Sequence, residues 1–418
     1  MDSTNPTPSS DAFPSWDFGS KKETEAPQNP PQSEGETTPS LEYPLPKKEA
    51  SGIESVTEMP RPLQTSTSKI LDLDLWWKTL MATVAEKKVT DIIFHPELCD
   101  CCIRVNTEVV LYQRIGPEHY KDIIYKMIPD DKKVEFEEKG ESDFAVTCFE
   151  RRMRVNVFKT LKGISGAFRP LPNKSIPWKD NGLTDAMMHV ISNTKQGLVL
   201  VTGPTGSGKS TTICSMLEYL NEKYPYHIIS IEDPIEYIFH NKRSVISQRE
   251  VGEHTLSFQS ALRASLRENP DIIFVGEMRD YETSRTALMA ADTGHLVFGT
   301  LHTRRVYTTI SRLLEMAPES SRAEMRAMLS NALAMVVCQR LLQKKGGGIW
   351  PCREVMMLNP AISSLIKEGK EKGISNQLTI NQKHGMVEWG KALELAERSG
   401  LITAEEAEKY RDSTEDVD

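Results

Sequence analysis

Nine consecutive residues near the middle of the chain have the composition and spacing of a phosphate-binding loop. They read Gly203-Pro204-Thr205-Gly206-Ser207-Gly208-Lys209-Ser210-Thr211, and the first eight fit the pattern G-x-x-x-x-G-K-[ST]. Glycines let such a loop curl until its backbone N–H groups face phosphate oxygens, and the start of the following helix adds partial positive charge. Lys209 would reach the β- and γ-phosphates, and the Ser210 hydroxyl would hold Mg²⁺. The sequence therefore predicts a nucleotide-binding site.

The segments on either side of this loop favour the same interpretation. Residues 197–202 are apolar and rich in β-branched side chains, as expected for a buried strand, and residues 212–220 carry apolar side chains at helical spacing. A strand, a loop and a helix in this order are the setting that the motif requires. The alternative, a glycine-rich turn that binds nothing, is disfavoured.

Acidic residues follow two further apolar strands. In residues 227–237, Pro234 ends the strand and leaves Glu232 at its carboxyl end, where α/β sheets bind ligands. The apolar run that starts at residue 271 ends at Glu277, an arrangement typical of a Walker B motif. We expect Glu277 to lie nearest the attacking water, and to hold Mg²⁺ through a water molecule, with Glu232 as the second carboxylate.

Charged residues and two histidines follow these acids. Arg279 and Asp280 are expected to pair with one another or with a neighbouring loop. In residues 293–303, His295 and His302 stand at the two ends of a short predicted strand. A zinc pair is disfavoured because no further Cys or His ligand is close in sequence. We expect one histidine to sense the γ-phosphate and the other to contact a neighbouring subunit.

Composition limits the class of protein. The chain has 418 residues, enough for two or three domains, and a formal net charge of −8, which argues against a surface built for nucleic acid. Its 7 cysteines show no repeated framework, as expected for a reducing compartment, and Cys214 and Cys338 are expected in the core on helices. No apolar run approaches the ~20 residues that span a bilayer. We therefore expect a cytoplasmic protein that reaches a membrane only through partners.

Proline and apolar residues divide the chain into segments. Residues 1–66 hold 11 of the 24 prolines, with many Ser, Thr, Glu and Gln, and such a composition cannot bury enough apolar surface to fold. An α+β pattern, a proline-rich linker and an alternation of strands and helices typical of a parallel sheet follow. The sequence thus predicts a disordered extension (1–66), a small N-terminal domain (67–169), a hinge linker (170–177), an α/β nucleotide-binding domain (178–358), a C-terminal helical region (359–412) and an acidic tail (413–418).

Taken in order, four sequence boxes resemble those of the secretion and type IV pilus ATPases. Besides the phosphate-binding loop they are an Asp box at 230–237, a Walker B motif at 271–280 and a His box at 293–303. Residues 248–251, 261–271 and 339–342 are most similar to the PilT-like pilus retraction branch of that family. The likeness extends from about residue 85 to residue 410.

This resemblance implies an α/β fold with a RecA-like ATPase domain, a PAS-like N-terminal domain and a ring of six copies. It implies that ATP is hydrolysed with Mg²⁺, that the domains rotate about the linker, and that this motion drives pilus retraction through an inner-membrane platform protein. A paralogous motor ATPase is a further partner that it suggests. In the family, arginines of the N-terminal domain reach the γ-phosphate, and the matching positions here are Arg154 and Arg169. The fixed fork of a guanidinium suits this task because it pairs with phosphate oxygens.

Two departures from the retraction branch leave the direction of work open. Ser363 and Ser364 stand where that branch carries an Arg-Asn pair needed for retraction, and the long N-terminal extension is foreign to it. The alternatives are an ATPase for pilus assembly or type II or type IVB secretion, and an accessory retraction subunit. From other classes, a non-hydrolysing ATP-binding regulator is disfavoured by the intact acids and histidines, and a DNA-translocating motor by the negative charge.

Overall fold

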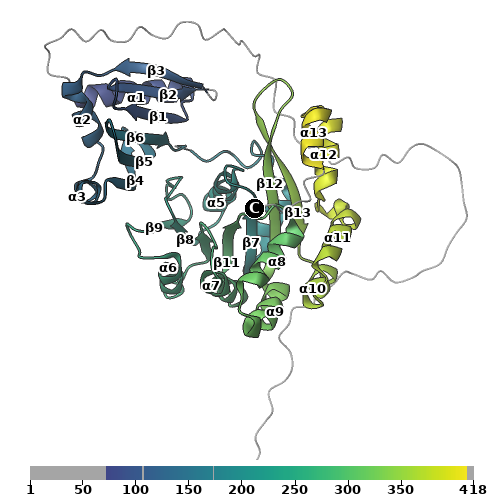
Figure 1. The fold of residues 1–418 in the computed structure, drawn as a ribbon. Helices are drawn as coiled ribbons and strands as arrows, with labels where there is room; N and C mark the ends of the chain where they lie inside the picture. The colour runs from purple at the N-terminus through teal and green to yellow at the C-terminus, as the bar shows by residue number, and fades with distance from the viewer. Residues whose placement is uncertain (1–71, 106–107, 173, 412–418) are drawn as a thin grey trace, which may run out of the picture. The chain divides into compact units, whose positions relative to one another are not determined.

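The computed structural model describes residues 72–105, 108–172 and 174–411, all of which belong to one compact unit. The extension predicted at 1–66 and the acidic tail predicted at 413–418 lie outside the described residues. The described part of the chain is an α/β structure with two sheets (Figure 1). This agrees with the α/β class predicted from the sequence.

The first sheet is antiparallel throughout and forms the N-terminal domain. Its strand order is β3-β2-β1-β6-β5-β4. The strands are β1 (Asp91–His95), β2 (Asp100–Val105), β3 (Glu108–Arg114), β4 (Glu141–Cys148), β5 (Arg151–Thr160) and β6 (Gly163–Pro170). The helices of this domain are α1 (Leu73–Lys87), α2 (Pro117–Tyr125) and α3 (Asp130–Lys139).

Aromatic packing joins α1 to this sheet. The Asp72 carboxylate begins α1 by accepting the backbone N–H groups of the next turn, at 3.1 Å each. One face of the helix then buries Trp77 against Phe94 of β1 and Phe168 of β6, with ring centroids 5.8 and 5.4 Å apart. The Trp77 indole N–H donates to the carbonyl of Ile123 at 3.0 Å, so α2 is fixed to the same core. This core holds β5 and β6 in place.

The second sheet carries the phosphate-binding loop, and we call the part of the chain from α4 onward the P-loop domain. Its strand order is β13-β12-β7-β11-β10-β8-β9, parallel except for the β12–β13 pair. The parallel sheet expected from the sequence is thus present from β12 to β9, and an antiparallel hairpin, which the sequence did not indicate, adds β13 at one edge. The strands are β7 (Gly197–Thr202), β8 (His227–Glu232), β9 (Val245–Glu250), β10 (Ile272–Val275), β11 (Leu296–Leu301), β12 (Leu333–Gln343) and β13 (Ile349–Met357).

Helices alternate with these strands and cover the sheet. They are α4 (Asp185–Asn193), α5 (Lys209–Lys223), α6 (Phe258–Ser265), α7 (Tyr281–Asp292), α8 (Val306–Met316) and α9 (Arg322–Ala332), with a 3-10 turn at Glu319–Ser321. The parallel strands β7, β8 and β10 are almost wholly buried, which explains their continuous apolar sequences. Because parallel strands end at the same edge, the segments after β7, β8, β10 and β11 meet there.

The C-terminal helices pack beside the β12–β13 hairpin, as Figure 1 shows in yellow. They are α10 (Pro360–Lys367), α11 (Ile374–Ile380), α12 (Trp389–Arg398) and α13 (Ala404–Arg411), with 3-10 turns at Glu371–Gly373 and Gln382–His384. Trp389 is buried, and the Arg340 guanidinium lies 5.7 Å from its ring and 5.7 Å from that of Tyr410. This cation–π contact joins β12 to the last two helices.

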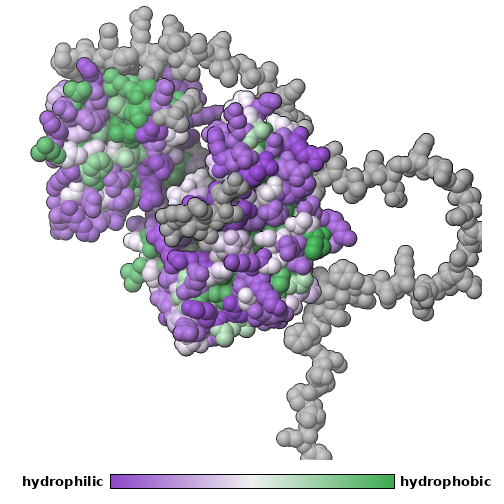
Figure 2. All heavy atoms as spheres, turned by 45° about the vertical axis from the view of Figure 1, so that its right-hand side comes forward, coloured by the Kyte–Doolittle hydropathy of each residue, from purple (hydrophilic) through white to green (hydrophobic). Residues whose placement is uncertain are grey.

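The surface differs between the two domains. In Figure 2, hydrophobic residues gather on the N-terminal domain, whereas the P-loop domain is mostly hydrophilic in that view. The large apolar side chains that the N-terminal domain exposes are Leu75, Leu98, Val109, Leu111, Val134, Phe149 and Leu161, and those exposed in the rest of the described chain are Ile176, Ile238, Val245, Leu256, Met289, Ile349 and Ile380. Among the described residues, no helix combines the length and the apolar character needed to cross a membrane.

Candidate nucleotide-binding site

The phosphate-binding loop connects β7 to α5 in a conformation that depends on glycine. Gly208 precedes the first turn of α5 with φ of 81°, and Gly203 has φ of 145°. A Cβ at Gly203 would lie 2.2 Å from the carbonyl oxygen of Gln339 on β12, so only glycine fits between the two strands. The loop is thereby held against β12 with its backbone curled around the start of α5.

Lys209 lies inside this curl. Its Nζ donates hydrogen bonds to the carbonyl oxygens of Gly203 at 2.8 Å and Pro204 at 3.3 Å. Burial lowers the pKa of Lys209, while the negative charges of Glu277 and Glu236 oppose the shift. Both acids therefore lie close enough for their charge to act on the ammonium group. The lysine is restrained in the position from which the motif predicts phosphate contact.

A cleft of about 460 Å³ opens over the loop. The loop contributes every residue from Thr205 to Thr211 to its wall, and the strand ends opposite contribute Glu232, Asp233, Glu236, Glu277, Arg279, Thr300 and His302. The Ser207 hydroxyl is buried there with no hydrogen-bond partner among the described residues. An orphaned hydroxyl, a lysine and curled backbone amides on one wall, with carboxylates facing them, fit a polyphosphate and the hard oxygen-liganded cation that accompanies it.

Glu277 is held by two cationic or protonatable side chains. Its Oε1 lies 2.6 Å from Arg279 Nε and 2.9 Å from His302 Nε2, and its Oε2 accepts from the Arg279 guanidinium at 2.7 Å. Burial raises the pKa of Glu277, but hydrogen bonds and charge from Arg279 and His302 outweigh it, so that pKa is lowered overall. Glu277 is therefore a carboxylate at neutral pH.

Arg279 and Asp280 do not pair with one another, which was the first of the two expected arrangements. Arg279 does not pair with Asp280, because the Asp280 carboxylate accepts from the backbone N–H and hydroxyl of Thr283 at 2.8 and 2.9 Å. Asp280 is thus the N-cap of α7. Arg279 is left to pair with Glu277, two residues before it.

Glu232 has a different environment from Glu277. It ends β8 with only 3% of its surface exposed, and its Oε1 accepts from Ser230 Oγ at 2.7 Å and Gln248 Nε2 at 3.3 Å. Burial raises the pKa of Glu232 to about 7, although these two hydrogen bonds oppose the shift. At neutral pH a large fraction of this carboxyl is protonated. Of the two acids, Glu277 is the better candidate to accept a proton or orient water.

The structure brings one of the two candidate arginines to the cleft. Arg154 of β5 lines it and is exposed, and no ion pair joins it to another described side chain. Arg169 of β6 is the cross-strand neighbour of Arg154, but its guanidinium pairs with Asp91 at 2.9 Å and does not line the cleft.

The two candidate histidines lie at opposite ends of β11, as the sequence predicts, and only one reaches the cleft. His302 follows the carboxyl end of the strand and contacts Glu277. His295 precedes the other end, where its ring Nδ1 lies 3.1 Å from the carbonyl oxygen of Ala290. Since β11 is parallel to β7, His295 is at the sheet edge away from the phosphate-binding loop. The structure does not bring His295 into the site of its own chain.

Sequence reasoning missed a buried polar network beneath the loop. Gln339 Nε2 donates to the Ser207 carbonyl at 2.6 Å, and its Oε1 accepts from Thr212 at 2.8 Å and from Arg353 Nε at 3.1 Å. The Arg353 guanidinium also donates to the carbonyl and side-chain oxygens of Asn181, at 2.7 and 2.9 Å. These residues are far apart in sequence, and the only local signal was the likeness of 339–342 to the retraction branch.

Comparisons with known proteins agree with this geometry. The family described as "Type II/IV secretion system protein" matches residues 81–407. The chain is 44% identical over 314 residues to the Type IV pilus retractation ATPase PilT of Pseudomonas aeruginosa, and the match covers 73% of this chain and 89% of that protein. It is 39% identical over 323 residues to a Twitching motility protein of Neisseria gonorrhoeae, with 76% and 86% covered.

A solved structure is also similar. It is described as the crystal structure of the pilus retraction motor PilT and bound ADP, and it matches with a TM-score of 0.76 at 39% identity. The match covers 84% of this chain and 99% of that chain. The resemblance stated from the sequence boxes is thereby confirmed, together with the α/β fold class.

Proposed function

Because this chain belongs to the type II/IV secretion system protein family, we propose that it is an ATP-hydrolysing motor that drives type IV pilus retraction. The observation that carries this proposal is the meeting, in one cleft, of the phosphate-binding loop with the Glu277–His302 pair. The relatives that support the retraction role are similar over most of their own length. The family match at residues 81–407 includes parts of both domains, so the likeness is not confined to the nucleotide-binding loop.

In this proposal the chain's own groups bind the substrate and orient water. The loop amides and Lys209 hold the phosphates of ATP, and Ser210 holds Mg²⁺ together with Glu277 through water. The bound cation would neutralise charge on the phosphate oxygens. Glu277 positions the attacking water and accepts its proton, with Glu232 as the second acid and His302 orienting Glu277. Each of these groups lines the cleft.

Arg154 is the proposed source of positive charge at the γ-phosphate, since it lines the cleft from the N-terminal domain. Arg169 would serve the same purpose only after leaving Asp91, or at the site of a neighbouring copy. His295 is proposed as a subunit contact. We propose that ATP hydrolysis moves the PAS-like domain relative to the ATPase domain, with the linker at 170–177 as the hinge.

The proposed assembly is a homo-hexamer that acts on an inner-membrane platform protein from the cytoplasmic side. A paralogous motor ATPase is a further proposed partner. Residues 67–169 and 178–358 are proposed as the moving domains, with the helical region at 359–412 attached to the second. Nucleic acid is not proposed as a partner because the net charge is −8.

Assembly or secretion remains the competing direction of work, and one observation favours it. Ser363 and Ser364 stand on α10 at the position where the retraction branch carries an Arg-Asn pair. Ser364 is exposed, and Ser363 Oγ donates to the carbonyl of Ser330 at 2.8 Å. The test is to delete the gene and count surface pili. The deletion strain is then supplied with either the wild-type gene or the Lys209→Ala variant, and only the wild-type gene should restore retraction. Pili that accumulate and fail to retract support the proposal, whereas loss of pili contradicts it and indicates assembly.

A further inference from the structure

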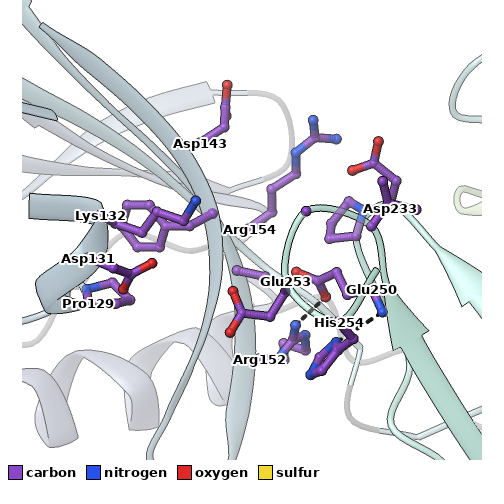
Figure 3. Close-up of a pocket in the computed structure, with 15 residues that line it drawn as sticks. Pro129, Asp131, Lys132, Asp143, Arg152, Arg154, Asp233, Glu250, Glu253 and His254 are labelled. Carbon is purple, nitrogen blue, oxygen red and sulfur yellow. Dashed lines mark hydrogen bonds and ion pairs between the residues drawn. The ribbon is translucent and has the colours of Figure 1, made fainter. Parts of the chain in front are cut away.

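Arg152 joins the N-terminal domain to the P-loop domain of the same chain. It lies on β5, and its guanidinium forms an ion pair with the carboxylate of Glu250 at the end of β9 (Figure 3). Its Nε donates to the carbonyl of Ile235 at 3.1 Å. Only 17% of the Arg152 side chain and 9% of the Glu250 side chain are exposed. An ion pair so shielded from water stabilises this arrangement of the two domains, because breaking it would leave a charge unpaired.

Glu250 in turn holds the loop that follows β8. Its carboxylate accepts the backbone N–H of Ile235 at 3.0 Å, and its own backbone N–H donates to His254 Nδ1 at 3.0 Å. Ile235 is therefore bound at both backbone groups, by Glu250 at its N–H and by Arg152 at its carbonyl. The two residues before it, Asp233 and Pro234, line the phosphate cleft.

Arg154 is two residues beyond Arg152 on the same strand. Side chains at i and i+2 of a strand lie on one face of the sheet, so both guanidinium groups extend from the same side of β5. Both line a cavity of about 300 Å³ shown in Figure 3, which also contacts Asp233 and Glu250. Arg154 additionally lines the phosphate cleft, and Arg152 does not. The position of Arg154 is thus set by a strand that Arg152 anchors.

We propose that Arg152 and Glu250 form a latch that positions Arg154 at the phosphate cleft. The inference rests on the proposed function, in which Arg154 supplies charge at the γ-phosphate. Arg152 is a positioning residue, since it acts through Arg154 and through the Ile235 loop. Arginine suits the latch because its fork binds a carboxylate and a carbonyl together, which a lysine ammonium does not reproduce.

The latch predicts that the effect of losing Arg152 or Glu250 depends on Arg154, which a contact that only stabilises the fold does not predict. If Arg152 and Glu250 act only by placing Arg154, their loss should reduce turnover when Arg154 is present and have little effect when it is absent. Nucleotide affinity should change less than turnover, because the loop amides and Lys209 lie on the P-loop domain.

The test compares steady-state ATP hydrolysis by the full-length chain with Arg152→Ala, Glu250→Gln and Arg154→Ala, alone and combined. Glu250→Gln is the milder change, because its amide oxygen can still accept the Ile235 N–H. Arg114→Ala is the matched control, because Arg114 lies on β3, the far edge strand of the same sheet, and pairs with Asp100 of β2. Urea unfolding monitors whether each variant is folded.

We expect Arg152→Ala and Glu250→Gln each to lower kcat about tenfold or more, with a smaller change in KM and normal hydrolysis in the control. Added to Arg154→Ala, either change should lower kcat no further. If Arg152→Ala has a normal kcat while Arg154→Ala is slow, the latch is overturned but the role of Arg154 stands. The same conclusion follows if the reductions in kcat of the single variants multiply in the combined variants. Normal hydrolysis by Arg154→Ala would instead overturn the role proposed for Arg154.

Discussion

His302 Nε2 lies 2.9 Å from Glu277 Oε1, which ties the carboxyl end of β11 to the acid that follows β10. The two strands are neighbours in the parallel sheet, with Val275 in register with Gly299. Their ends therefore meet wherever this sheet forms, although 25 residues separate the two side chains. His302 also helps to lower the pKa of Glu277, so that the carboxylate stays ionised at neutral pH.

Removing this contact should slow hydrolysis. We expect His302→Ala to reduce kcat about 10- to 100-fold, since a partner that orients a functional carboxylate typically contributes that much. His189→Ala is the control, because His189 is exposed on α4 and contacts Asn193. Phosphate release at saturating ATP measures both. Wild-type kcat in His302→Ala would show that Glu277 needs only Arg279.

The close approach of the loop to β12 predicts a steric effect. Gly203→Ala places a methyl group 2.2 Å from the Gln339 carbonyl oxygen, whereas the same change at Gly206, with φ of 77°, meets no atom within 4 Å. Both variants pay for an unfavourable backbone conformation, of about 1 kcal/mol, but only the first adds a clash. Urea unfolding should therefore show Gly203→Ala to be about 2 kcal/mol or more less stable than wild type. Equal destabilisation by the two variants would contradict this.

The buried carboxyl of Glu232 predicts a pH effect on stability. Its pKa is raised to about 7 in the folded state, so it keeps a proton at pH values where the unfolded chain, with an ordinary value of 4.5, has lost it. The unfolded state then binds fewer protons, and the free energy of unfolding falls as pH rises from about 4.5 to 7. A pKa that is higher by one in the folded than in the unfolded state corresponds to a fall of about 1.4 kcal/mol.

Glu232→Gln should remove part of this fall, leaving the part due to Glu354, whose pKa burial also raises to about 7. Urea unfolding from pH 5 to 8 measures the slope, and Glu86→Gln, an exposed change on α1, is the control. If the free energy of unfolding of Glu232→Gln depends on pH as it does in wild type, then Glu232 does not cause this pH dependence.

Local motifs made the chemical core of the site predictable. The phosphate-binding loop, Glu232 and Glu277 each stand at the end of an apolar strand, and a parallel sheet must bring such ends together. His295 shows the limit of this reasoning. The sequence placed the two histidines at the ends of one strand, but which end faces the loop depends on strand direction, and β11 runs parallel to β7.

Contacts between distant segments were not predictable. Gln339 and Arg353 meet Asn181 and the loop through side chains separated by up to 172 residues, and nothing in their local sequence indicates burial of polar groups. Cys338 was expected on a helix and lies buried in β12. A short apolar run does not distinguish a buried strand from a buried helix, since both faces of each are covered.

Phosphate release by the purified full-length chain with Mg²⁺ and ATP, compared among wild type, Lys209→Ala and Glu277→Gln, tests hydrolysis at this cleft most directly. Lys209→Ala should abolish turnover. Glu277→Gln should still bind nucleotide but turn over at least about 100-fold more slowly, because the group that accepts the proton from water is lost. Glu282→Gln, which changes an exposed acid paired with Arg263, should turn over normally. A rate near that of wild type in Glu277→Gln would contradict the assignment of this cleft as the site that drives the motor.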